Sequence, residues 1–115
     1  MKYEYYKTLL GEYINVGRSK ERLLGEIGYP EEITLTVEGL TMAVSIIVAA
    51  AEADIKRIVD LSGLSMRAFA AKYSIPYRTV QDWCSGSRKP PEYLPMMIGY
   101  LLISELPEDA GNGDI

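Results

Sequence analysis

The sequence predicts an all-α protein of about five helices, and three observations lead to that prediction. Apolar residues recur every three or four positions along most of the chain, which is the spacing of one helix face. Serine, threonine, proline and glycine stand where such helices would begin or end. The one strand-like stretch, residues 31–37 (EEITLTV), is short and has no evident partner strand, so we expect it to be extended rather than part of a sheet.

Composition limits the class of protein. A chain of 115 residues with 48% hydrophobic residues can bury a core without disulfides or a bound metal. The single cysteine, Cys84, has no partner for an internal disulfide, which is typical of the reducing cytoplasm. No export signal is visible at the N-terminus, and the longest uncharged stretch, residues 39–51, is shorter than the ~20 residues that span a membrane. We therefore expect a soluble, cytoplasmic protein without a membrane partner.

An enzyme is the least expected class. The chain has no histidine, no glycine-rich phosphate loop after a strand and no metal-ligand spacing. The acidic pair Glu31 and Glu32 is interpreted as solvated rather than catalytic. The sequence therefore predicts neither catalysis nor a cofactor or metal site.

Residues 1–36 are predicted to form an N-terminal extension. A face of aromatic and aliphatic residues at spacings of three and four predicts an amphipathic helix over residues 1–15: Tyr3, Tyr6, Leu10 and Tyr13. Ser19 would cap a short second helix through Leu24, and the extended segment follows. Such an aromatic surface either covers a helix of the same chain, which we favour, or contacts another protein.

A single long helix is predicted over residues 37–61, with Thr36 as its N-cap. Its apolar residues recur every three or four positions: Val37, Leu40, Val44, Ile47, Ala51, Ile55 and Ile58. A stripe of this kind usually packs into the core of its own chain, and the alternative is a dimer seam. The second half of this helix, from Ala53, would be the first helix of the unit that follows.

Residues 61–91 carry the most informative pattern in the chain. Ser65 would cap a first helix over residues 66–73, and a second helix is predicted over Pro76 to Ser85. Gly86 would end that second helix in a left-handed conformation. Two short helices joined by a tight turn are the sequence form of a helix-turn-helix.

The apolar residues of the C-terminal half are expected to face the core. Val80 and Trp83 mark the buried side of the second helix. A last helix over residues 93–105 is expected to pack five apolar residues on the core: Leu94, Met97, Ile98, Leu101 and Leu102. Residues 37–105 would then form one helix-turn-helix domain, followed by an acidic, disordered tail over residues 106–115.

The helix pair shares a series of positions with a known family: Leu64, Ser65, Phe69, Ala70, Ile75, Thr79, Val80, Trp83, Gly86, Arg88 and Pro90. On these residues, the stretch 55–91 resembles the phage-repressor-like (XRE-type) helix-turn-helix family, and the resemblance covers roughly the second half of the chain. Three positions depart from the family pattern. Met66 replaces a glutamine that contacts phosphate, Ser74 replaces a glycine in the turn, and Cys84 replaces an acidic residue.

The resemblance implies that the second helix enters the major groove of double-stranded DNA. Four exposed positions of that helix would then read base edges: Tyr77, Arg78, Gln81 and Asp82. Phosphate contacts are implied for four further residues: Thr79, Arg67, Arg88 and Lys89. In this interpretation Arg78 suits guanine and Gln81 suits adenine, while Asp82 either accepts from cytosine or repels the DNA backbone. Outside such a motif, these side chains would be ordinary solvated residues.

Charge along the chain is uneven, although the total is −4. Between Ser62 and Tyr93 there are five basic and two acidic side chains, a local balance of +3, whereas the flanking parts are acidic. Local charge governs the approach to a polyanion, so this segment is the one that suits nucleic acid.

Two functions follow from the sequence. The first is a sequence-specific DNA-binding transcriptional regulator that acts as a homodimer, held together by the long helix or by the tyrosine-rich N-terminus. The alternative is an adaptor or antitoxin-like protein that keeps the fold, binds DNA weakly or not at all, and contacts a protein through residues 1–36. The acidic isoelectric point of about 4.8 favours the alternative.

Overall fold

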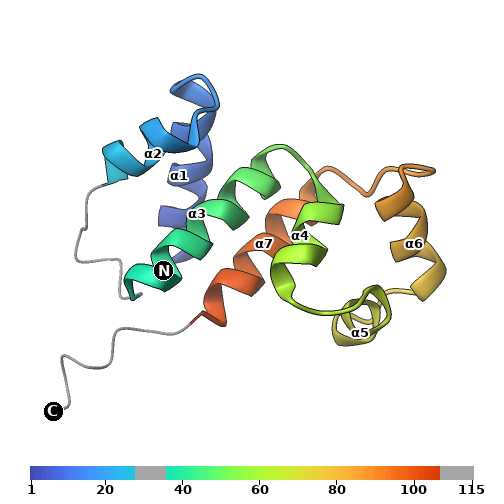
Figure 1. Cartoon of the computed structure of the whole chain (residues 1–115). Helices are drawn as coiled ribbons and strands as arrows, with labels where there is room; N and C mark the ends of the chain where they lie inside the picture. Colours follow the sequence, from blue (N-terminus) through green and yellow to red (C-terminus); the bar gives the residue numbers. More distant parts are fainter. Residues whose placement is uncertain (28–35, 107–115) are drawn as a thin grey trace, which may run out of the picture.

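The computed structural model describes residues 1–27 and 36–106, and within them every regular element is an α-helix (Figure 1). The predicted all-α class is confirmed. The described residues form seven helices, more than the five or so expected: α1 (Tyr3–Asn15), α2 (Lys20–Ile27), α3 (Val37–Ala51), α4 (Ile55–Ser62), α5 (Met66–Lys72), α6 (Tyr77–Ser85) and α7 (Tyr93–Ser104).

The predicted long helix over residues 37–61 is wrong, because the chain breaks between α3 and α4. Ala53 adopts a left-handed conformation with φ of 56°, which no helix interior tolerates. The side chain of Asp54 then accepts a hydrogen bond from the backbone N–H of Arg57 and caps α4. The cap and the burial of Ile55 and Ile58 offset the strain at the break.

Most of the other helix ends agree with the sequence to within a residue or two, but α2 continues to Ile27, three residues beyond the end predicted at Leu24. The side chains of Thr36 and Ser65 cap α3 and α5 by accepting bonds from the N–H groups of Gly39 and Ala68. Gly86 ends α6 with φ of 85°, in the left-handed region that glycine adopts without strain. These ends position the α5–α6 pair, since a cap fixes where a helix begins and in which direction the chain enters it.

Two helices, α3 and α7, lie side by side in the middle of the molecule (Figure 1). At one end α1 and α2 pack on α3, and at the other end α4 carries α6 and α5. The apolar stripe predicted for the long helix is mostly core, with Val44, Ile46 and Ile47 almost fully buried. The stripe is therefore used within the chain and is not available as a dimer seam.

The N-terminal tyrosines also pack within the chain, as favoured from the sequence. Tyr6 and Tyr13 are buried, and the Tyr6 hydroxyl donates a 2.7 Å hydrogen bond to the carbonyl oxygen of Met96 in α7. The ring of Tyr3 contacts that of Tyr100 edge-on, at 5.1 Å between centroids. Helix α1 is thereby attached to α7, which begins about 90 positions later in the sequence.

One sequence expectation fails on α7 and another on α6. Ile98 and Leu102 are buried as predicted, but Met97 is 49% exposed and Leu101 is 44% exposed. Helix α7 is apolar on nearly every side, so periodicity alone does not identify its buried face. On α6 Val80 is fully buried, whereas Trp83 is only half-buried at the edge of the core.

Several predictions concern residues that the structure does not describe. The extended segment lies outside the described residues except for Thr36 and Val37, which begin α3. The acidic tail lies outside them except for Leu106, whose side chain packs at the edge of the core. Among the helices that are described, none is long and apolar enough to cross a membrane.

Candidate nucleic-acid interface

The α5–α6 pair is held by a small apolar core against α4. Phe69 and Val80 are fully buried and Ala70 is 3% exposed, so one residue or two from each helix closes the contact. Ala70 is small where the two helices approach, which allows their backbones to come close. This inner face is uncharged, so the charged residues of α5 and α6 lie on the outer surface.

The turn between α5 and α6 contains a strained residue. Ser74 has φ of 57°, the left-handed conformation that glycine adopts without strain and other residues rarely adopt. The N–H of Ile75 donates to the carbonyl oxygen of Ala70 at 2.9 Å, which closes the end of α5. The turn therefore keeps its tight geometry with a serine in a left-handed conformation.

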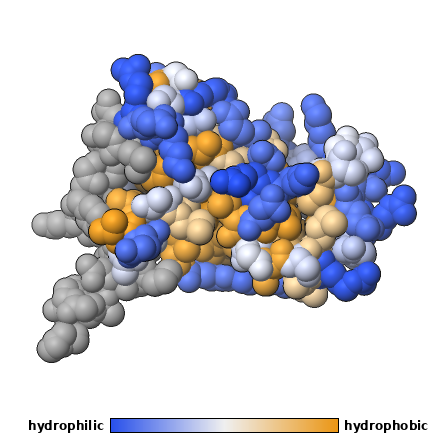
Figure 2. Space-filling view, viewed as in Figure 1, coloured by the Kyte–Doolittle hydropathy of each residue, from blue (hydrophilic) through white to orange (hydrophobic). Residues whose placement is uncertain are grey.

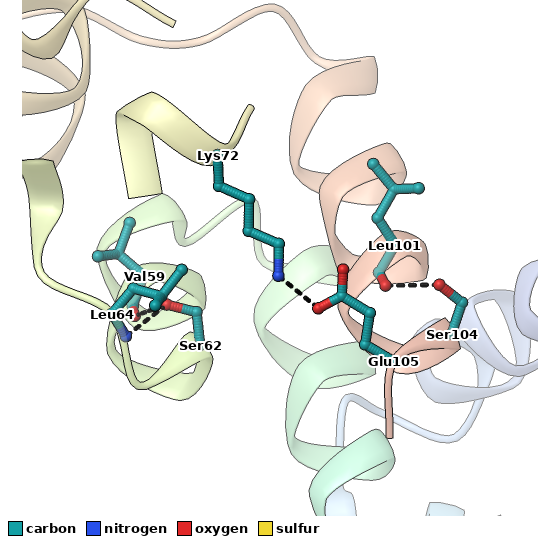
Figure 3. Close-up of polar contacts among 7 residues, drawn as sticks. All are labelled: Val59, Ser62, Leu64, Lys72, Leu101, Ser104 and Glu105. Carbon is teal, nitrogen blue, oxygen red and sulfur yellow. Dashed lines mark hydrogen bonds and ion pairs between the residues drawn. The ribbon is translucent and has the colours of Figure 1, made fainter. Parts of the chain in front are cut away.

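The link between α4 and α5 is fixed by a single hydroxyl group. Ser62 donates to the carbonyl oxygen of Val59 and accepts from the N–H of Leu64 at 3.1 Å (Figure 3). Gly63, between these partners, has φ of 75° and supplies the left-handed residue that ends α4. The connections that lead into α5 and into α6 are thus both defined by local hydrogen bonds.

Arg67 and Tyr77 come together across the α5–α6 turn. The guanidinium carbon of Arg67 lies 4.1 Å from the centre of the Tyr77 ring, within the range of a cation–π contact. Arg67 is exposed and Tyr77 is half-buried, so the stacked pair faces outward at the start of α6. A predicted phosphate contact and a predicted base contact therefore share one small surface.

Arg78 and Asp82 form an ion pair one turn apart on α6. Arg78 Nε lies 3.3 Å from Asp82 Oδ1, and the two side chains are 85% and 23% exposed. Exposed pairs of this type contribute little to stability. The pair instead affects where the Arg78 side chain lies. Asp82 holds the guanidinium group at Nε, and the two terminal nitrogens of Arg78 remain free to donate to another molecule.

Gln81 lines a shallow pocket of about 430 Å³ between α4, α5 and α6. Met66 and Cys84, two of the positions that depart from the family pattern, line the same pocket. Burial raises the pKa of the Cys84 thiol, so the group stays protonated near neutrality and is unsuited to thiolate chemistry. Lys56 of α4 also lines this pocket, a neighbour of Gln81 that no sequence pattern identified.

The loop after α6 presents two more cations. Arg88 and Lys89 are exposed, and neither pairs with an acidic side chain in the part of the chain that the structure describes. The N–H of Arg88 donates to the carbonyl oxygen of Asp82 at 3.2 Å, which ties the loop to α6. Thr79 is half-buried, so it is the least accessible of the four predicted phosphate contacts.

Lys72 contributes less to this surface than its charge suggests. Its ammonium group pairs with Glu105 at the end of α7 (Figure 3). That hydrogen bond raises the pKa of Lys72 and holds the side chain away from the outer face of α6. No sequence pattern indicates this pair, because its members lie 33 positions apart.

The cations that remain gather at one end of the molecule. Figure 2 shows that hydrophilic residues predominate at the right-hand end of this view, over α5 and α6, whereas hydrophobic residues reach the surface nearer its middle.

Comparisons with models of known protein families, with curated proteins and with solved structures found no significant match to this chain. The site is therefore interpreted from its own geometry.

Proposed function

We propose that the protein is a sequence-specific DNA-binding transcriptional regulator in which α5 and α6 act as a helix-turn-helix and α6 enters the major groove. One observation carries the proposal. The inner face of the α5–α6 pair is sealed by Phe69, Ala70 and Val80, while its outer face and the loop that follows present four cations: Arg67, Arg78, Arg88 and Lys89. A rigid helix with a cationic outer face is the arrangement that major-groove binding needs.

Arg78 is the main base-reading residue in this proposal. Asp82 holds the Nε edge of its guanidinium, so the two terminal nitrogens are directed together at one acceptor pair. Guanine presents such a pair, O6 and N7, in the major groove. Tyr77 then contacts a neighbouring base, and Gln81 reads adenine.

Phosphate contacts come from the rim of the same surface. Arg88 and Lys89 lie in the loop that is tied to the end of α6, and Arg67 lies at the start of α5. Together with Thr79 they would fix the register of α6 on the duplex without reading sequence. Because these contacts displace counterions, affinity is expected to fall steeply as salt rises.

A homodimer would place two copies of α6 on two half-sites. Successive major grooves on one side of B-DNA are ~34 Å apart, so the half-sites would be centred about 10 base pairs apart. A symmetric operator is therefore expected, with guanine at the same position in each half.

Selection from a randomised duplex library tests the proposal without knowledge of the operator. Wild-type protein is expected to enrich a two-fold symmetric sequence, and fluorescence anisotropy on that sequence then compares Arg78→Ala with Arg22→Ala. Arg78→Ala should lose about 1–3 kcal/mol of discrimination at the guanine position. Arg22, an exposed arginine of α2, is the matched control and should leave discrimination unchanged. Failure of the wild-type protein to enrich any sequence at low salt would overturn the proposal.

Asp82→Asn separates two roles of this residue: positioning Arg78, which the ion pair supports, and repelling the DNA backbone, which was one of the two interpretations of the sequence. If Asp82 positions Arg78, the variant loses preference for guanine while its general affinity changes little. If Asp82 only repels the DNA backbone, the variant binds all duplexes more tightly and keeps its preference, since one negative charge is gone.

An adaptor that contacts another protein remains the second candidate. Met66 in place of a phosphate-binding residue, and the net charge of −4, favour it. Neutralising Arg78, Arg88 and Lys89 together would abolish DNA binding under the first function and would leave protein binding intact under the second.

A further inference from the structure

Helix α7 presents a ridge of large apolar residues to solvent. Tyr93, Met97 and Leu101 are 59%, 49% and 44% exposed. They lie four positions apart, so they occupy one face of α7 over about 12 Å of its length. We call these three residues the α7 ridge. Three large apolar side chains in a row are unusual on the surface of a monomer and mark a place where another surface packs.

The surroundings of the α7 ridge are apolar as well. Tyr3, Met96 and Tyr100 are half-buried beside it, and together these six residues line a shallow hollow of about 400 Å³. No charged residue lines the hollow. The Tyr100 hydroxyl already donates to the carbonyl oxygen of Met1 at 3.1 Å, so this polar atom is satisfied without a partner.

A charged rim marks the end of the ridge. Glu105 occupies the next position on the same face, one turn beyond Leu101, and Lys72 of α5 reaches across to pair with it (Figure 3). An apolar centre with a paired charge at its edge is the usual anatomy of a protein interface.

We propose that two copies of the chain meet at the α7 ridge, packing it against itself about a two-fold axis. An uncharged face is complementary to its own copy, because neither like charges nor unpaired charges are brought together. The chain's own C-terminal residues fit this face poorly, since positions 107–115 hold three acidic residues and one large apolar residue, Ile115. DNA fits it poorly too, because the ridge has no cation.

The size of the surface predicts how strong the contact is. Six large side chains, each partly buried already, present on the order of 500 Å² per copy, given that a whole aromatic side chain buries ~150–250 Å². A standard stable interface buries ~800 Å² per partner. The dimer is therefore expected to be weak, with a dissociation constant in the micromolar range or above, and to form more readily when both copies are on one DNA.

This inference deepens the proposed function by naming the surface that joins its two copies, yet its test needs no DNA. Sedimentation equilibrium from about 5 µM to 1 mM is expected to show a mass that rises from one chain towards two, as mass action requires for a weak dimer. Met97→Lys with Leu101→Lys should weaken association at least tenfold. Val37→Lys with Met42→Lys is the matched control, since both residues are exposed apolar residues of α3, and it should associate as the wild-type protein does.

A second measurement guards against variants that fail to fold. Amide chemical shifts of the wild-type protein, followed by NMR over the same concentrations, are expected to change on α7 and at the start of α1 and nowhere else. A wild-type mass of one chain at every concentration would overturn the inference. So would concentration-dependent shifts confined to other helices, or a ridge variant that folds and still dimerises. Each of these results leaves DNA binding by α6 to be judged separately.

Discussion

The two ends of the molecule differ in what some of their basic side chains contact. At the α1–α2 end, cations pair within the chain: Arg18 lies 3.1 Å from Glu52, and Lys20 Nζ donates to Ser45 Oγ at 2.8 Å. At the α5–α6 end, Arg88 and Lys89 pair with no acid among the described residues. Arg18 and Lys20 therefore help to hold the fold, whereas Arg88 and Lys89 are available for a partner.

The ends also differ in how they are held. Helix α1 depends on contacts between residues far apart in sequence, such as the bond from Tyr6 to Met96. Helices α4 to α6 depend on local devices, the caps of Asp54 and Ser65 and the left-handed ends at Gly63 and Gly86. Because caps and turns position α5 and α6, few of their outer side chains are needed to attach them to the rest of the chain, and the outer face of this end stays free.

Among the variants that test this difference between the two ends, Phe69→Ala is expected to change the unfolding free energy most. Phe69 is fully buried where α5 meets the rest of the core, so its truncation should cost about 3–5 kcal/mol of unfolding free energy. Urea unfolding measures the cost, and hydrogen exchange shows where it falls. Protection is expected to drop first in α5 and α6. An equal loss in α1 and α2 would show that the two ends do not differ in the way described.

Gly99→Ala probes the other attachment. A Cβ at Gly99 would lie 2.6 Å from the Tyr6 hydroxyl and 3.2 Å from Ala50 Cβ, so α1 must shift and a loss of about 1–3 kcal/mol is expected. Gly11→Ala is the matched control, because nothing lies within 4 Å of its Cβ position in α1 and helix propensity should stabilise it by up to ~1 kcal/mol. Equal thermal shifts for the two variants would refute the close packing of α1 on α7.

Removing one hydroxyl at each end should change stability in opposite directions. Tyr6→Phe loses the bond to Met96 and is expected to cost about 1 kcal/mol. The Tyr73 hydroxyl is buried and has no hydrogen-bond partner among the described residues, so Tyr73→Phe should be neutral or stabilising. Chemical unfolding of both variants checks this pair. The sign of the change in unfolding free energy for Tyr73→Phe decides the question, because a clear loss of stability would mean that the hydroxyl has a partner.

The smallest effect is expected in the α5–α6 turn. Ser74→Gly relieves a left-handed serine and should stabilise the protein by up to ~1 kcal/mol. Ala71→Gly, three positions earlier on the exposed side of α5, should destabilise it by a similar amount, because glycine weakens a helix interior. Thermal melting of the two variants is sufficient, and shifts of the same sign would contradict the strained turn.

Local features were the ones that could be predicted from sequence. The caps at Thr36 and Ser65 and the stop at Gly86 follow from residue type and position, so their elements were found. The break at Ala53 was missed because alanine gives no sign of a left-handed conformation and the apolar spacing continues across it. The exposed side of α7 was missed because that helix is apolar all round, and only packing against α3 selects its buried face.

For the candidate site, too, the positions of single residues could be predicted from sequence, whereas contacts between elements could not. The positions of Arg67, Arg78, Arg88 and Lys89 on an outer surface follow from helix periodicity and loop position. Three features do not follow from it: the stacking of Arg67 on Tyr77, the pairing of Lys72 with Glu105, and the pocket that Gln81 lines. Each of these requires two elements to be brought together by the fold.

Matched charge removal from the two ends tests the central claim most directly. Arg88→Ala with Lys89→Ala removes two positive charges beside α6, and Lys2→Ala with Arg22→Ala removes two exposed positive charges from the other end. Both variants and the wild-type protein are titrated with one duplex over a series of salt concentrations. The α6 variant should lose about two units of the slope of log affinity against log salt, while the control keeps the wild-type slope. Equal slopes for the two variants would contradict the claim that α6 and the loop after it form the DNA-binding end.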